Sequence, residues 1–413
     1  MLAADLQAAR LAPALMKGHR LALTAAVAIS GAASLILEVV WFRRLGLSSG
    51  VVAGAAGVVT AAYMGGLALG NYLGSRISDR SRYRLWIYAG AEALVAFSAL
   101  VAPRVLAPLA SDASPLAWTA VGAVLLIPTT AMGLGLPLLA CSFGRDTSHG
   151  GRIAAFLYGV NTTGAGLGVA WVGFFGLSRL GPEAVTTIAI ALQSVVVLIV
   201  ASVAVRVGPE SEYHSQTREA GAPHWGALCG AGLASAAAMW VQVTWTERAA
   251  TWVTAPGQGF SMTVLAYLVG LALGGFFAMT LIERFRSLHR TVTVMLAITA
   301  TALACAALFA GHWQPTPGAA TLAVVLPLVP MTASGGTLFP LFIACSLRSG
   351  ATIGVAVGTT GAASTLGAIV GSLVGAVLVP LFEVGPALAA GVIAYGGLGG
   401  VFWLATAGDT DRP

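Results

Sequence analysis

Long runs of apolar residues, separated by short polar breaks, make up most of this chain. Twelve runs are long enough to cross a lipid bilayer as helices, because about 20 apolar residues span the hydrocarbon core. They cover residues 21–45, 51–77, 85–106, 117–142, 153–177, 184–205, 226–245, 259–281, 291–311, 319–346, 351–381 and 385–406. A membrane barrel would instead show short strands of alternating polarity. The pattern predicts an all-α polytopic membrane protein with about 12 transmembrane helices.

One longer polar segment, residues 208–225, separates the first six apolar runs from the last six. Its charged residues have no metal-ligand spacing, so we interpret it as a solvated cytoplasmic linker. We therefore expect an N-terminal six-helix half at residues 1–207 and a C-terminal six-helix half at residues 226–413.

The second half of the chain nearly repeats the first. The run from Tyr63 to Gly70 reads YMGGLALG, and the run 204 positions later, from Tyr267 to Gly274, reads YLVGLALG. The same spacing aligns Glu38 with Gln242. Such a duplication predicts two parallel six-helix repeats, and in transporters the substrate site lies where the repeats meet.

The composition excludes a soluble globular protein, because 57% of the residues are hydrophobic and only 9% are charged. The 52 glycines favour close packing of helices through small residues. Most Lys and Arg residues fall on one side of the bilayer if both termini are cytoplasmic, so we interpret the net charge of +6 as a topology signal and expect no nucleic-acid partner. We expect a multi-pass protein of the bacterial plasma (inner) membrane.

No motif of an enzyme or of a cofactor-binding domain occurs in the sequence. There is no P-loop, no HExxH, no GxSxG and no GxGxxG after a strand, and the cysteines lie in apolar runs without CxxC spacing. We therefore expect no enzymatic activity, no cofactor and no metal site, and an intramembrane enzyme is the least favoured class of function.

Five short motifs occupy particular places in the apolar runs. They are SGAAS at residues 30–34, EVVWFRR at 38–44, GGLALG at 65–70, MGLGLP at 132–137 and NTTGAGLG at 161–168. In this combination the chain resembles the integral membrane part of the fused major-facilitator/spermidine-synthase family. The resemblance implies a major-facilitator-like fold, whereas the soluble aminopropyltransferase-like domain of that family has no counterpart in the sequence.

The polar loop from Asp79 to Arg84, DRSRYR, is similar to the facilitator loop between spans two and three. In facilitators an acidic residue and basic residues of this loop latch the two halves together. The resemblance implies this gating role for Asp79, Arg80 and Arg84, and the repeat adds Glu283 and Arg284 at the matching positions.

Two carboxylates fall inside predicted spans, where a charge costs about 2.5–3.5 kcal/mol on insertion scales. Glu38 lies toward the outer end of the first span and Glu92 toward the inner end of the third. One hypothesis makes them outer and inner stations for a cation or a proton. The other pairs Glu38 with an external arginine such as Arg43 or Arg44, and Glu92 with a backbone amide or a hydroxyl. The sequence leaves both hypotheses open.

Other polar side chains fall close to the expected midplane, where they either line a substrate cavity or bridge helices. With Glu38 and Glu92 they complete the candidate substrate- or ion-binding set, and they are Tyr63, Asn71, Asn161, Thr162, Gln242 and Tyr267. Trp41 and Trp245, at matching outer positions, are predicted to join an aromatic belt. Prolines predict kinks in the fourth and tenth spans, at Pro128, Pro137, Pro330 and Pro340.

The sequence favours a transporter-like protein that moves a small metabolite by alternating access, with the lipid bilayer and that metabolite as partners. The carboxylates favour a cation, and the resemblance suggests a polyamine. The alternative is a non-transporting membrane module that anchors or feeds an aminopropyltransferase-like (spermidine-synthase-like) enzyme. In that case a separate aminopropyltransferase-like protein would be the partner.

Overall fold

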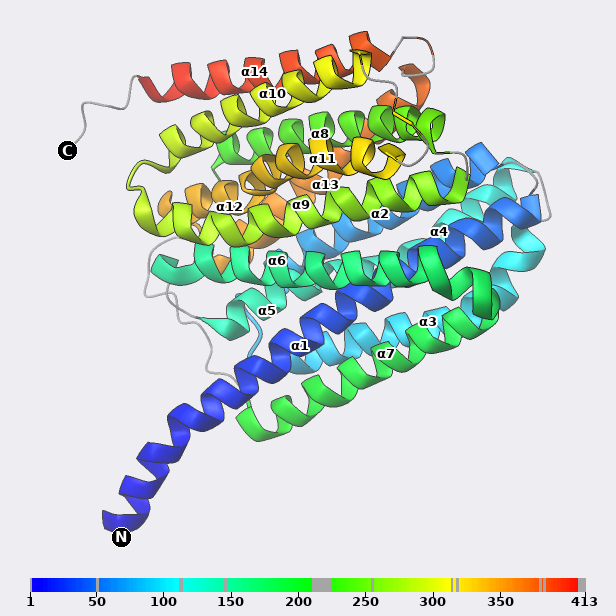
Figure 1. Ribbon diagram of the computed structural model, residues 1–413. Coiled ribbons are helices and arrows are strands. Elements are labelled where there is room, and N and C mark those ends of the chain that lie inside the picture. The colour runs from blue at the N-terminus through cyan, green and yellow to red at the C-terminus, as the bar shows by residue number, and fades with distance from the viewer. Residues whose placement is uncertain are drawn as a thin grey trace.

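The computed structural model describes residues 2–49, 52–110, 114–144, 147–209, 224–253, 256–312, 315–316, 319–378, 381 and 384–407. These residues are almost entirely helical and form one bundle of long helices (Figure 1). Most of the expected linker at 208–225 lies outside the described residues.

The helices follow the predicted spans closely. Their bounds are α1 Leu2–Ser49, α2 Val52–Ile77, α3 Arg84–Ala110, α4 Pro115–Gly133, α5 Gly135–Phe143, α6 Thr147–Trp171, the π-helical turn η1 Val172–Gly176, α7 Leu177–Val207, α8 Trp225–Trp252, α9 Pro256–Arg284, α10 Leu288–His312, α11 Ala320–Gly336, α12 Leu338–Arg348, α13 Ile353–Leu378 and α14 Val384–Ala407. Within the described residues, 10 helical stretches are long and apolar enough to cross a membrane. The prediction of an all-helical polytopic membrane protein is confirmed.

The longest of these stretches, Thr147–Val207, holds two predicted spans. Its 61 residues would be about three times as long as the hydrocarbon core is thick if they formed one straight helix. The chain folds back at Gly181, whose φ of 76° lies in the left-handed region that glycine reaches without strain. Pro182 follows directly and starts the returning helix, since its fixed φ suits a first helical position.

Spans four and ten are each broken into two helices, at Leu134 between α4 and α5 and at Thr337 between α11 and α12. The prolines predict kinks in these spans, and the breaks fall just before Pro137 and Pro340. Both prolines occupy the first turn of the second helix, where a missing N–H forfeits no helical hydrogen bond.

The helices before and after the linker pack in the same way. Helix α1 packs on α6, α2 on α4 and α3 on α7, just as α8 packs on α13, α9 on α11 and α10 on α14. A Cβ at Gly70 would lie 2.8 Å from the Cα of Gly133, and one at Gly274 would lie 2.9 Å from the Cα of Gly336. Glycine at these paired positions lets the backbones of neighbouring helices touch.

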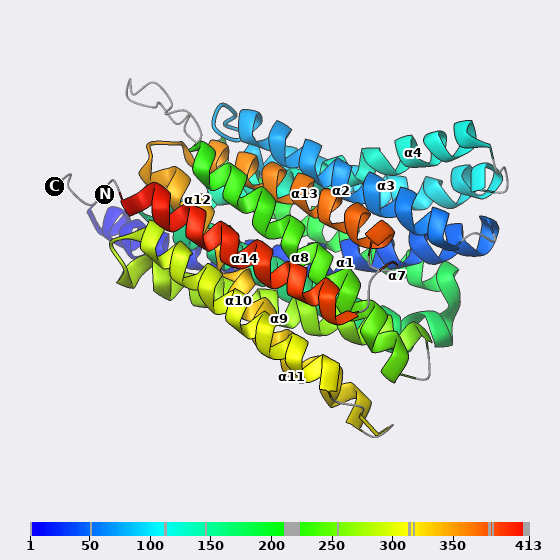
Figure 2. The same ribbon diagram turned by 90° about the horizontal axis from the view of Figure 1, so that it is seen from above.

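Two further helix pairs join the N-terminal helices α1–α7 to the C-terminal helices α8–α14. Helix α6 packs beside α9 (Figure 1), and α13 packs beside α2 (Figure 2). Because α2 corresponds to α9 and α6 to α13 in the repeat, the two contacts are equivalent. This arrangement is what a twofold axis between the two sets of helices would produce.

The prediction of an aromatic belt position for Trp41 and Trp245 is wrong. Trp41 is 2% exposed and Trp245 is fully buried, and the indole N–H of Trp245 donates to the carbonyl of Val324 at 3.3 Å. Sequence position gives the depth of a residue along its helix, but not the side of the helix that faces lipid. Both indoles face inward and fill the hydrophobic cores.

A central cavity as candidate functional site

A cavity of about 750 Å³ lies where the N-terminal and C-terminal helices meet. Its wall is built from both sets, with α1–α6 on one side and α8–α14 on the other. The volume is within the range of pockets that hold small molecules.

All eight residues of the predicted substrate- or ion-binding set lie in this wall. Glu38 comes from α1, Tyr63 and Asn71 from α2, and Glu92 from α3; Asn161 and Thr162 come from α6, Gln242 from α8 and Tyr267 from α9. Asn71 also donates its amide N–H to the carbonyl of Leu67 at 2.9 Å. The structure thus brings together residues that are up to 229 positions apart, from Glu38 to Tyr267 (267 − 38).

Glu38 is half-buried on the cavity wall, beside Tyr63. The structure does not support its predicted pairing with Arg44, because that guanidinium makes an ion pair with Glu183 at 3.1 Å. Among the residues whose side chains are described, none forms an ion pair with Glu38. Its carboxylate is therefore available to a cation that enters the cavity.

Glu92 lies deeper in the wall and is only 3% exposed. Its Oε1 accepts a hydrogen bond from the hydroxyl of Ser30 at 2.6 Å, as the hydroxyl hypothesis expects. Tyr88 and Gln193 approach the same carboxyl group, but Oε2 of Glu92 has no hydrogen-bond partner of good geometry in the described part of the chain. Glu92 is therefore a carboxyl group held by one short hydrogen bond from α1.

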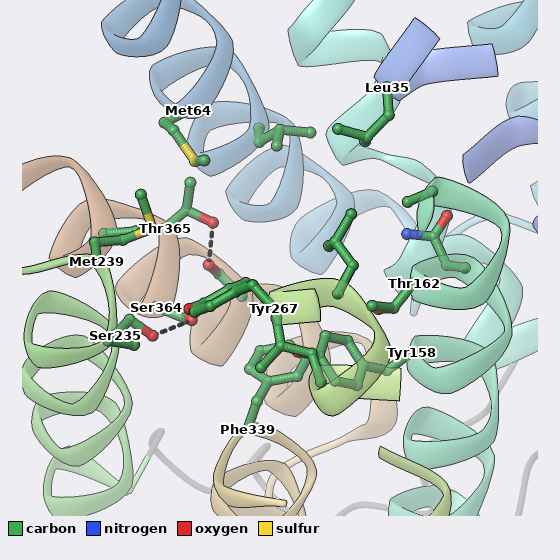
Figure 3. A pocket seen from close by; sticks show the side chains of 18 of the residues that line it. Leu35, Met64, Tyr158, Thr162, Ser235, Met239, Tyr267, Phe339, Ser364 and Thr365 are labelled. Atoms are coloured by element: carbon green, nitrogen blue, oxygen red, sulfur yellow. Dashed lines mark hydrogen bonds between the residues drawn. The ribbon is translucent and has the colours of Figure 1, made fainter. Parts of the chain in front are cut away.

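Aromatic side chains of α6, α9 and α12 form one part of the wall. The rings of Tyr158 and Phe339 pack at 5.0 Å between centroids with a tilt of 48°. Figure 3 shows Tyr267 projecting into the pocket between them and Ser364, with Thr162 next to Tyr158. Sequence reasoning missed Tyr158, although it precedes the predicted Asn161 and Thr162 by about one helical turn and so shares their face.

Two serines bridge α8 and α13 across one side of the pocket. The hydroxyls of Ser235 and Ser364 are 2.6 Å apart and hydrogen-bonded (Figure 3). In the repeat they correspond to Gly31 and Asn161, whose helices α1 and α6 also touch at this point. The neighbouring Thr365 donates its hydroxyl to the carbonyl of Gly361 at 2.8 Å.

The charged residues of the cavity wall are all acidic. Within the described residues, the wall contains Glu38, Glu92 and Glu247 and no Lys, Arg or His. Glu247 is exposed and lies near the C-terminal end of α8, so it stands at the mouth of the cavity. The arrangement suits a positive charge, and it would repel an anion.

The predicted latch residue Asp79 joins the two sets of helices at one end of the bundle. Its carboxylate accepts hydrogen bonds from the hydroxyl of Thr352 at 2.5 Å and from the backbone N–H groups of Gly354 at 3.1 Å and Val355 at 3.2 Å. The thiol of Cys141 lies 3.6 Å away and also donates to it. Asp79 of the N-terminal set therefore caps the first turn of α13, where unpaired N–H groups and the helix dipole favour a negative charge.

The repeat counterpart of Asp79 makes the equivalent contact by different means. Glu283, in the last turn of α9, forms an ion pair with Arg152 in α6. The neighbouring predicted residues Arg80 and Arg284 are exposed at the same end of the bundle. Arg84 is only 2% exposed, and its guanidinium donates to the carbonyl of Ser78, so it stiffens the loop that carries Asp79.

The lining of the cavity does not reach the end of the bundle that carries these contacts, and it extends toward the other end. Its lining reaches Phe42 and Glu247, near the C-terminal ends of α1 and α8, but includes neither Asp79 nor Glu283. Because α1 and α2 run in opposite directions, Phe42 and Asp79 lie at opposite ends of the bundle (Figure 1).

The chain is similar over nearly its whole length to solved structures of the major facilitator superfamily and related transporters. The proton:xylose symporter XylE, bound to 6-bromo-6-deoxy-D-glucose, matches with a TM-score of 0.64 and 14% identity, over 95% of each chain. The transporter FucP in the outward conformation matches with a TM-score of 0.60 and 16% identity, over 92% of this chain and 97% of its own. A bacterial homologue of the iron transporter ferroportin, in an outward-facing state, matches with a TM-score of 0.64 and 13% identity, over 94% and 99%.

No protein-family model matches the chain, and no curated protein is similar to it in sequence. At 13–16% identity the structural likeness concerns the fold. The chain is a multi-pass membrane protein with a major-facilitator-like fold, as the resemblance implies.

Proposed function

We propose that this protein is a transporter that moves a small organic cation across a membrane by alternating access. The observation that carries the proposal is the central cavity, which both sets of helices line and whose charged residues in the described part of the chain are all acidic. A ligand in this place contacts both sets of helices, so a rocking motion between them would expose it first to one side of the membrane and then to the other.

In this proposal Glu38 is the counter-ion of the substrate, because its carboxylate faces the cavity and no described side chain forms an ion pair with it. The remaining residues of the predicted set shape the site around it. The fold supports a division into an N-terminal half at 1–207, a linker at 208–225 and a C-terminal half at 226–413. The proposal keeps both termini on the cytoplasmic side of the bacterial plasma membrane.

The contacts of Asp79 and Glu283 would hold the cavity shut at their end. Asp79 caps α13 and Glu283 pairs with Arg152, so both bonds cross between the sets of helices. Opening the cavity at that end requires the hydrogen bonds of Asp79 to α13 and the ion pair of Glu283 to break. With Arg80, Arg84 and Arg284, these residues form the proposed latch.

The alternative, a module that anchors or feeds an aminopropyltransferase-like enzyme, needs no polar cavity. A sealed apolar interface between the two sets of helices would have favoured it, whereas a cavity with carboxylates favours transport. The polyamine that the resemblance suggests is one of the organic cations to test.

Flux through purified protein in liposomes tests the proposal. We expect liposomes that contain the protein to take up more of a labelled organic cation than protein-free liposomes do. The Glu38→Gln variant should lose this uptake. Glu183→Gln is the matched control, because Glu183 is an exposed carboxylate that pairs with Arg44 outside the cavity. Absence of flux for every organic cation, amino acid and polyamine tried, in protein with unchanged thermal unfolding, would contradict a transport function.

A further inference from the structure

The cavity also indicates which kind of cation it would take, and the argument rests on the proposed function. Its wall combines few charges with many apolar and aromatic side chains. Tyr158, Tyr267 and Phe339 form one aromatic surface, and Met64 and Met239 lie on α2 and α8 at another side (Figure 3). Aromatic faces attract cations and also bury apolar groups, and methionine adapts to irregular ligands.

Several hydroxyl groups of the wall donate to the protein itself. Ser235 and Ser364 bond to each other at 2.6 Å, and Thr365 donates to the carbonyl of Gly361 at 2.8 Å. Tyr395 likewise donates to the carbonyl of Ala234 at 3.1 Å, and Thr299 to that of Met295 at 2.8 Å. Since a hydroxyl has only one O–H to donate, these groups, apart from the accepting serine of the pair, have no O–H left for a ligand.

The carboxylates are also arranged unequally. Glu92 is 3% exposed and already accepts a bond from Ser30, while Glu247 stands at the mouth. In the described part of the chain, Glu38 is therefore the carboxylate that combines a place inside the cavity with partial exposure to it. A linear polyamine needs an acceptor for each of its ammonium groups, and one partly exposed carboxylate inside the cavity does not provide that.

We propose that the cavity binds an amphipathic organic monocation, whose charge pairs with Glu38 and whose aromatic or branched apolar body packs against Tyr158, Tyr267 and Phe339. The size of the cavity, about 750 Å³, accommodates such a body. Sugars and linear polyamines fit this wall poorly, because several of its hydroxyls already donate within the protein and its apolar surface would stay uncovered.

Calorimetric titration of the protein in lipid nanodiscs tests the proposal without any transport step. The probes are tetraphenylphosphonium, its neutral analogue triphenylphosphine oxide, the small cation tetramethylammonium and the polyamine spermidine. We expect tetraphenylphosphonium to bind at least about tenfold more tightly than each of the others, a difference of about 1.4 kcal/mol. Empty nanodiscs measure partition into lipid.

Variants assign the two parts of the ligand to their residues. Glu38→Gln should weaken tetraphenylphosphonium at least about tenfold and leave triphenylphosphine oxide unchanged, because only the charged probe loses a partner. Phe339→Leu should weaken both probes by a similar factor of a few, because each loses the same aromatic contact. Thermal unfolding of each variant shows that the fold is intact, and Glu183→Gln again serves as the exposed-carboxylate control.

The outcomes separate this proposal from the proposed function. Equal or tighter binding of spermidine, or equal binding of the neutral analogue, would overturn the ligand class even if the protein transports another cation. Selective binding of tetraphenylphosphonium without any flux in liposomes would uphold the ligand class and overturn transport.

Discussion

The N-terminal and C-terminal helices share one packing plan and differ in their charges. Glu38 on α1 corresponds to Gln242 on α8, and Glu92 on α3 corresponds to Leu296 on α10, 204 positions later. The buried residues of α3 and α10 follow each other at this spacing, and Leu296 is fully buried where Glu92 is 3% exposed. A leucine therefore suffices to pack this position, and the carboxyl group of Glu92 has no packing role that would explain it.

The latch shows the same divergence at a shared position. Asp79 uses the N-terminus of α13, whereas Glu283 uses the side chain of Arg152. The duplication has thus kept the contacts between backbones and allowed the polar chemistry to differ. Among the described residues, only the N-terminal helices place a carboxylate inside the cavity, since Glu247 of α8 lies at its mouth.

The largest expected effect comes from breaking what the two sets of helices share. Valine at Gly70 or at Gly274 would drive a side chain into the backbone of the neighbouring helix, at Gly133 or Gly336. We expect either change to cost several kcal/mol and to abolish the recovery of monodisperse protein, because overpacking of a close backbone contact cannot relax. Gly397→Val is the control, since nothing lies within 4 Å of a Cβ there. Size-exclusion chromatography and thermal unfolding measure the result, and normal behaviour of Gly274→Val would contradict the packing described.

The next effect concerns the carboxylate of Glu38, which the C-terminal helices replace with the amide of Gln242. Glu38→Gln should lower kcat/KM for cation flux by about 10–150-fold, the equivalent of a charge-assisted hydrogen bond of about 1.5–3 kcal/mol. Gln242→Ala should lower it less than about threefold. The double variant Glu38→Gln/Gln242→Glu moves the carboxylate to the repeat position, and we expect it to recover part of the flux. Equal losses of kcat/KM in Glu38→Gln and Gln242→Ala would contradict the proposal that the two repeats contribute unequally to cation binding.

An exchange between Glu92 and Leu296 sharpens the comparison of buried positions. Glu92→Leu should leave the free energy of unfolding unchanged or raise it by about 1 kcal/mol, because an apolar group replaces a carboxyl group with an unpaired oxygen. Its transport rate should nevertheless fall if the carboxyl group has a functional role. Leu296→Glu should destabilise the protein by several kcal/mol, because it buries a carboxyl group among apolar side chains. Thermal unfolding and flux, measured on the same preparations, check both; a large loss of stability in Glu92→Leu would show a structural role.

Small effects are expected at the latch, and they should differ between its two sides. Asp79→Ala removes the cap of α13 and should destabilise the closed arrangement by about 1–2 kcal/mol. Glu283→Gln breaks a largely exposed ion pair and should cost less than about 1 kcal/mol. Single cysteines placed near Thr352 would report opening at this end through their labelling rate. Faster cysteine labelling in Glu283→Gln than in Asp79→Ala would contradict the larger effect expected for Asp79→Ala.

Much of this molecule follows from the sequence alone. The length and apolar character of the runs determined the number and order of the helices, because a bilayer admits few other structures for such segments. The repeat determined which helices are equivalent, and intramembrane polar residues supplied the candidate site. These polar residues are informative because burying a polar group in lipid is costly, so few of them occur within membrane-spanning segments.

The tertiary structure decided how these residues meet. The direction in which Trp41 and Trp245 point, the partner of Arg44, and the cap that Asp79 places on α13 depend on rotations and contacts between helices that no span pattern records. The helix face of Tyr158 could be predicted from its spacing to Asn161, but its packing against Phe339 could not, since aromatic residues occur throughout an apolar sequence. Hydrophobicity sets the depth of a residue along its helix, but its neighbours are set by how close the backbones pack.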